Sequence, residues 1–148
     1  MKYYFFLITF LIFTNCNVAF NHSRAGWEYL NKNNYDAAIA EFDAAFSHDS
    51  LPGTYLGYIK ACLGKGNAET AYEYLARGLK KHPDDEFLLV TAGHIYEMQR
   101  NFCEALLFYR RANKTAFGKV SNSMYKRIEM HIKSMEDSIR VNNITCSE

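Results

Sequence analysis

Apolar and polar residues follow three different patterns along the 148-residue chain. Residues 3–13 are eleven consecutive residues without a charge. From residue 20 to residue 118, large apolar and small residues recur three and four positions apart, the spacing of one face of a helix. Residues 119–141 keep this spacing but surround the apolar stripe with charges. These patterns predict a separate N-terminal segment, a helical region over 20–118, a further helix over 119–141 and a flexible tail over 142–148.

The central region contains an internal repeat. Asn34, Asn67 and Asn101 are spaced by 33 and 34 residues, and each leads into an acidic residue and an alanine. An asparagine that accepts from the next backbone N–H groups, followed by a carboxylate in the first turn, is typical of a helix start. A large apolar residue follows each alanine after four positions and a small one after seven: Phe42 and Ala45, Leu75 and Gly78, Tyr109 and Ala112.

A second amphipathic stretch precedes each of these asparagines, so each repeat is predicted to be two helices joined by a tight turn. Gly26, Gly93 and the alanines are expected to let the two helices of a repeat approach closely. We expect the aromatic residues of the next repeat to fill the space around them.

This pattern resembles the tetratricopeptide repeat family, in which Leu-Gly-x2-Tyr, Ala-x3-Phe and Pro recur with a period of about 34 residues. The third repeat matches best, with Ala92-Gly93-x2-Tyr96 and Ala105-x3-Tyr109, whereas only the second has the proline, Pro83. The resemblance implies an all-α fold, a right-handed α-α superhelix of three helix pairs over about 20–52, 53–85 and 86–118, plus a C-terminal capping helix. An ordinary helical bundle whose alanines recur by chance is the alternative.

The helix predicted over 119–141 has five apolar residues on one face: Tyr125, Ile128, Ile132, Met135 and Ile139. A repeat array must cover its last apolar face, and an amphipathic helix with a charged outer side does so. A membrane-surface helix or a helix that binds a partner is the alternative. Its charges are mixed in sign rather than basic, which weighs against a membrane surface.

The N-terminal segment, 1–19, has one positive charge, a short apolar run and then small and polar residues, the layout of a secretory signal. It is too short for a membrane-spanning helix, which needs about 20 apolar residues. Cleavage after Ala19, retention as an uncleaved anchor, and acylation of Cys16 in the manner of bacterial lipoproteins stay open. We therefore expect export, to the periplasm or cell envelope of a bacterium or into the secretory pathway of a eukaryote, with membrane contact only through this segment.

Four cysteines are present, and their spacing matches neither a zinc site nor a redox motif. Cys62 and Cys103 are expected to be small buried apolar residues. One disulfide among Cys62, Cys103 and Cys146 is the alternative.

The sequence has none of the motifs typical of metal binding, phosphate binding or nucleophilic catalysis. The five histidines include no pair at i and i+4, and neither a phosphate-binding loop nor a nucleophile motif occurs. We therefore predict no metal site, no cofactor and no enzyme activity. A formal net charge of +1, from 17 basic and 16 acidic residues, removes the electrostatic argument for a nucleic-acid partner.

The family resemblance implies a concave groove that holds an extended peptide or a partner helix. Carried over by register, the groove residues are Ser23, Trp27, Leu30, Leu56, Lys60, Leu63, Val90, His94 and Glu97. Trp27 is a candidate anchor, with packing against a neighbouring helix as the equal alternative. The chain is thus predicted to be an exported adaptor for a protein or peptide. The second hypothesis is a structural or assembly subunit that uses the capping helix or the convex face. The sequence leaves the oligomeric state open.

Overall fold

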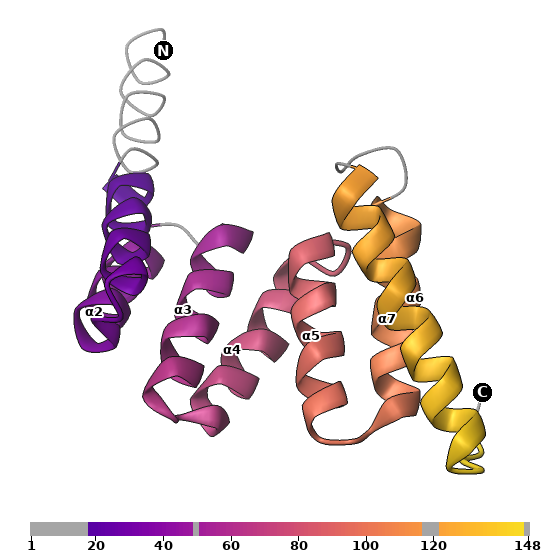
Figure 1. Cartoon of the computed structure of the whole chain (residues 1–148). Coiled ribbons are helices and arrows are strands. Elements are labelled where there is room, and N and C mark those ends of the chain that lie inside the picture. Colours follow the sequence, from indigo (N-terminus) through magenta and orange to yellow (C-terminus); the bar gives the residue numbers. More distant parts are fainter. Residues whose placement is uncertain (1–17, 49–50, 117–121, 147–148) are drawn as a thin grey trace, which may run out of the picture. The chain divides into compact units, whose positions relative to one another are not determined.

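A computed structural model describes residues 18–48, 51–116 and 122–146, which form helices and contain no strand. The first helix covers 18–31. The others are α2 (Tyr35–Phe46), α3 (Pro52–Lys65), α4 (Ala68–Lys81), α5 (Glu86–Met98), α6 (Phe102–Ala116) and α7 (Asn122–Val141) (Figure 1). The all-α prediction is confirmed. Residues 1–17, with Cys16 and most of the expected signal segment, lie outside the described residues.

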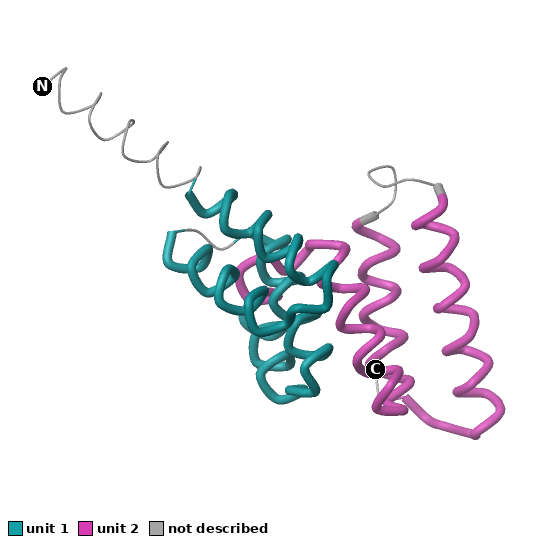
Figure 2. The backbone as a smooth tube through the Cα atoms, turned by 60° about the vertical axis from the view of Figure 1, so that its left-hand side comes forward, with its two compact units in different colours: residues 1–77 teal, residues 78–148 magenta. Residues whose placement is uncertain are grey.

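The chain divides into two compact units, 1–77 and 78–148, with the boundary inside α4 (Figure 2). Within the first unit α2 packs on α3, and within the second α5 packs on α6 and α6 on α7. The predicted repeat boundaries at 52/53 and 85/86 lie within one residue of a helix start, since α3 begins at Pro52 and α5 at Glu86. The predicted boundary at 19/20 lies inside the first helix, 18–31.

Three turns of the same geometry join helices at the predicted asparagines. Asn33, Gly66 and Arg100 have left-handed backbones, with φ of 55°, 85° and 58°. The N–H groups of Asn34, Asn67 and Asn101 donate to the carbonyl five residues earlier, at 2.9–3.0 Å. The N–H of each left-handed residue donates to the carbonyl three residues earlier. This pair of bonds satisfies carbonyls that a helix end otherwise leaves without partners.

The same three asparagines also start the next helices, as the sequence predicts. The side-chain oxygens of Asn34 and Asn67 accept from a backbone N–H three residues ahead at 3.3 Å, and that of Asn101 does so at 3.4 Å. Each asparagine therefore closes one helix with its own N–H and opens the next with its side chain. The tight-turn prediction is confirmed at all three positions.

Glycine and an aromatic ring meet where paired helices are closest. A Cβ on Gly26 would lie 2.6 Å from the Phe42 ring, and one on Gly93 would lie 2.6 Å from the Tyr109 ring. Both rings are fully buried. Each comes from the second helix of the glycine's own repeat, so the expectation that the next repeat supplies the aromatic residue is wrong. Phe42 also contacts Gly57 in α3, where the following repeat begins.

Helix α7 covers apolar surface of α5 and α6. Ile128 packs with Leu89 and Ala112, and Met135 packs with Ala105 and Tyr109. Ile132 and Ile139 are half-buried against the same clusters. The apolar stripe predicted for 119–141 therefore faces the preceding helices.

A disulfide joins Cys103, in the first turn of α6, to Cys146, beyond the end of α7. The expectation that Cys103 is a buried free residue is wrong, because its side chain is half-buried and bonded. Cys62 is buried and free, as predicted. The bond attaches the segment after α7 to α6, so residue 146 is not a loose end of the predicted tail.

Adding a methyl group at the close helix contacts should destabilise the fold. Gly26→Ala and Gly93→Ala are each expected to lower the free energy of unfolding by about 1–3 kcal/mol, because the fully buried rings of Phe42 and Tyr109 would have to shift to make room. Urea denaturation followed by circular dichroism measures the change. Gly53→Ala is the matched control, since a Cβ there would meet nothing within 4 Å. Equal stability of all three variants would contradict the packing argument.

Removing the disulfide should destabilise the second unit. Cys103→Ser is expected to lower the free energy of unfolding by about 2–4 kcal/mol, because the bond closes a loop with a sequence separation of 43 residues and restricts the unfolded chain. Thermal melts of the variant, and of the parent chain with and without reductant, measure the effect. Cys62→Ser is the control variant. If the loss of stability comes from the bond between Cys103 and Cys146, reductant should lower the melting temperature of Cys62→Ser as much as that of the parent chain.

Candidate functional site

In the first unit, two of the predicted groove residues form a cation–π pair. The Lys60 Nζ lies 5.3 Å from the centroid of the Trp27 ring. Trp27 meets Phe42 edge to face, with ring centroids 6.2 Å apart. Lys60 is exposed and Trp27 is half-buried. The indole is therefore held from one direction by the core and covered from another by an exposed ammonium group. The contact with Phe42 fits the interpretation of Trp27 as a packing residue, and its role as a partner anchor stays a prediction.

The other candidates of this unit are less accessible. Ser23 is 9% exposed, and the Thr54 hydroxyl donates to its hydroxyl at 3.2 Å. Thr54 is itself buried, so this bond satisfies two polar groups inside the helix packing. Ser23 therefore belongs to a helix contact and not to an open surface. Leu30, Leu56 and Leu63 are half-buried.

In the second unit, all three predicted groove residues meet helix α7. Val90 packs against both apolar clusters that contain α7 residues. The Nε2 atom of His94 lies 3.3 Å from Nε2 of His131. A Glu97 carboxylate oxygen lies 3.4 Å from Nδ1 of His131. Val90, His94 and Glu97 thus share a face of α5, and α7 lies against that face.

Tyr109 organises this polar cluster. Its hydroxyl donates to Glu97 at 2.6 Å, and its ring stacks on the His131 ring with centroids 4.9 Å apart. The His94 ring meets Tyr109 edge to face at 5.7 Å. Burial raises the pKa of Tyr109 above its ordinary value, and the hydrogen bond to Glu97 and the charge of that carboxylate raise it further. Tyr109 therefore stays a neutral hydrogen-bond donor.

Sequence reasoning misses His131 and the polar role of Tyr109. A signal for His131 is present, because it lies three residues after Ile128 and four before Met135, which places it beside the buried stripe of α7. Nothing in the sequence pairs it with His94, which precedes it by 37 residues. That pairing depends on how α7 packs.

Reactive groups are few in the described part of the chain. Within it, no three or more histidine, cysteine, aspartate and glutamate side chains gather where a metal ion could sit. Burial raises the pKa of the Cys62 thiol, so this side chain stays protonated and is a poor nucleophile. Burial likewise raises the pKa of Asp43, against an opposing hydrogen bond from Tyr58.

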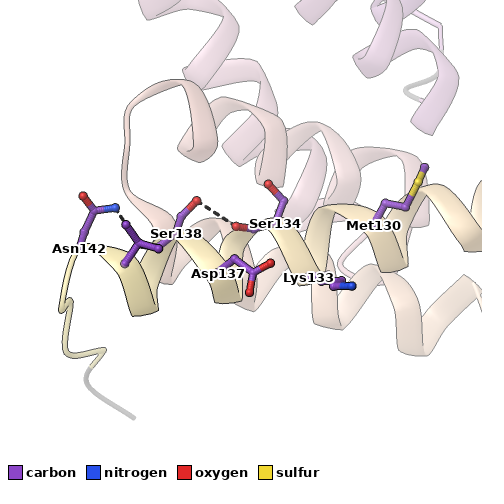
Figure 3. Close-up of a pocket in the computed structure, with 7 residues that line it drawn as sticks. Met130, Lys133, Ser134, Asp137, Ser138 and Asn142 are labelled. Atoms are coloured by element: carbon purple, nitrogen blue, oxygen red, sulfur yellow. Dashed lines mark hydrogen bonds between the residues drawn. The ribbon is translucent and has the colours of Figure 1, made fainter.

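A shallow cavity of about 510 Å³ lies along the outer side of α7 (Figure 3). Met130 and Val141 in its lining are 63% and 79% exposed. Its lining comes from α7 and the residue that follows the helix: Met130, Lys133, Ser134, Asp137, Ser138, Val141 and Asn142. Over the described residues, no helix is both long enough and apolar enough to cross a bilayer.

Removing the Tyr109 hydroxyl should change stability and its dependence on pH. Because the folded-state pKa is raised, this group stabilises the fold fully below its unfolded pKa of about 10, and the contribution is lost as pH rises above that value. Tyr109→Phe is expected to cost about 1–2 kcal/mol at pH 7, since Glu97 loses its donor. The decline above pH 10 should become shallower. Urea unfolding at pH 7, 9 and 10.5 measures both effects, and an unchanged alkaline slope would contradict them.

No protein-family model matches the chain, and no curated protein matches it either.

Proposed function

We propose that this chain is an exported tetratricopeptide-type adaptor that binds a peptide or helix of a partner protein. In this proposal its helix pairs continue as a right-handed α-α superhelix. Three turns with the same hydrogen bonds and the glycine–aromatic contacts at equivalent positions support the repeat architecture. A scaffold of packed helices presents side chains at fixed positions, which suits recognition.

The Trp27–Lys60 pair is the observation that carries the binding proposal. An indole already fixed by Phe42 loses little conformational entropy when a partner covers it. Tryptophan is also the residue type most enriched at energetically important interface positions. The exposed Lys60 ammonium adds a point charge beside that apolar ring. Together they suit a partner segment with an apolar side chain next to a carboxylate.

Two separate features support export. The first is the charge-free run over residues 3–13, which follows Lys2. The second is the disulfide between Cys103 and Cys146, since structural disulfides persist in secreted and envelope proteins and are rare in reducing compartments. Cleavage of the N-terminal segment and acylation of Cys16 are both compatible with them.

The outer side of α7 favours a second function, that of an assembly subunit. Met130 and Val141 are apolar side chains that remain exposed, and the cavity that they help to line also has Lys133 and Asp137 in its wall. A helix with an apolar inner stripe would not need these outer apolar residues for folding alone. In this case a partner would contact α7, and the Trp27–Lys60 surface would not be used.

Replacing the cation–π pair should weaken partner binding without unfolding the chain. Trp27→Ala is expected to reduce affinity by about 30-fold or more, the effect typical of a central interface anchor, and Lys60→Ala by a smaller factor. The partner is identified by cross-linking and affinity purification from the native source, and its dissociation constant is then measured with purified proteins. Circular dichroism checks that helicity is kept.

Two control variants separate the candidate functions. Lys32→Ala removes an exposed lysine from the same unit and should leave affinity unchanged. Met130→Ser combined with Val141→Ser removes apolar surface from the outer side of α7. Loss of binding in this double variant, with normal binding by Trp27→Ala, would reject the adaptor surface in favour of the assembly subunit.

A further inference from the structure

Two histidine rings face each other across α5 and α7 with their outer nitrogens close together. Nε2 of His94 and Nε2 of His131 are 3.3 Å apart, and the ring centroids are 4.8 Å apart. Both side chains are half-buried, and 31% of the His131 side chain is exposed. The pair is therefore partly open to solvent.

Neighbouring groups hold the His131 ring in an orientation that suits metal binding. The Glu97 carboxylate can only accept a hydrogen bond, and it faces Nδ1 of His131 at 3.4 Å. It therefore favours the tautomer with hydrogen on Nδ1, which leaves the lone pair on Nε2. Without an ion, that lone pair accepts a hydrogen bond from Nε2–H of His94. When an ion binds, the hydrogen on Nε2 of His94 is lost to solvent and His94 takes the tautomer with hydrogen on Nδ1. The Tyr109 ring stacks on His131, and its hydroxyl holds Glu97 at 2.6 Å. A carboxylate on the far nitrogen of a histidine is the usual outer support of a metal-bound imidazole.

The distance between the two Nε2 atoms matches that of two ligands on one metal ion. Two nitrogens bound to a tetrahedral zinc ion, with bonds of about 2.0–2.1 Å, lie about 3.3–3.4 Å apart. We propose that His94 and His131 bind one transition-metal ion through their Nε2 atoms. Imidazole ligands suit Zn²⁺ and Cu²⁺ among the common divalent ions. Glu97 and Tyr109 are positioning residues in this site and do not touch the ion.

The remaining coordination positions of the ion would be open. Glu97 lies on the Nδ1 side of His131, and within the described ranges no third histidine, cysteine, aspartate or glutamate is placed to bind the ion with the pair. Water or a ligand from outside the chain would therefore complete the shell. The pair His22 and His48 provides an internal contrast. Its rings are stacked nearly parallel with centroids 6.4 Å apart, and Nδ1 of His22 is bonded to Glu41. We expect no shared ion there.

Calorimetric titration of the full chain with ZnCl₂, with the disulfide intact, tests the proposal. We expect one ion per chain and a rise in melting temperature on binding. His94→Gln and His131→Gln should each weaken binding by at least tenfold. Glu97→Gln should weaken it by about 10–100-fold while leaving the ligands in place. His48→Gln is the matched control and should bind as the parent chain does.

A second measurement on the parent chain keeps the test independent of how the variants fold. Nitrogen NMR of the imidazole rings should show zinc-dependent shifts at Nε2 of His94 and His131, with the Nδ1 hydrogen of His131 retained. The proposal is overturned if zinc binding is absent, if both histidine variants bind like the parent chain, or if other ring nitrogens carry the shifts. Neither experiment needs the protein partner, so the result is separate from that of the adaptor proposal.

Discussion

The contact between a glycine and an aromatic ring sets the distance between the paired helices. At Gly26 and Gly93 the backbone itself is the surface on which Phe42 and Tyr109 pack, and both rings are fully buried. Such close approach buries apolar surface between the two helices. A larger side chain in place of glycine would keep the helices further apart and leave that surface less buried. The positions of the other side chains on these helices follow from that distance. In the second unit they include the face of α5 that meets α7 and the ring that lies beneath His131.

One oxygen atom distinguishes these equivalent contacts chemically. Phe42 fills its site as a hydrocarbon and lies beside Trp27. Tyr109 fills the equivalent site in the second unit, and its hydroxyl reaches out of the core to Glu97. A buried phenol requires a hydrogen-bond partner, so this substitution within the repeat brings a carboxylate and two histidines into one network. The repeat thus carries an apolar contact in one unit and a polar cluster in the other.

Local features were predictable from the sequence, and features that depend on distant packing were not. Asn34, Asn67 and Asn101 are recognisable because a helix cap acts on backbone groups three residues away. The left-handed Asn33 and Arg100 are harder to find. Glycine is the usual marker of that conformation, and of the three turns only the one at Gly66 has a glycine there. The pairing of Cys103 with Cys146 depends on where α7 ends in space. Ser23 shows the same limit. Register assigns Ser23 to a face of its helix, but it does not show that Thr54 of another helix contacts that residue.

The shared turn also restricts how chains of this kind can change in length. In each turn, one asparagine is bonded backward through its N–H and forward through its side chain, with a single left-handed residue before it. An inserted residue would separate these two roles and break one set of bonds. The described connection between α4 and α5 is held differently: Asp85 caps the helix that follows, and its N–H donates to the carbonyl only three residues earlier, at 3.3 Å. No residue from 82 to 85 has a left-handed backbone. The one-residue difference between the 33- and 34-residue spacings therefore lies outside the turns, and insertions or deletions should be tolerated there first.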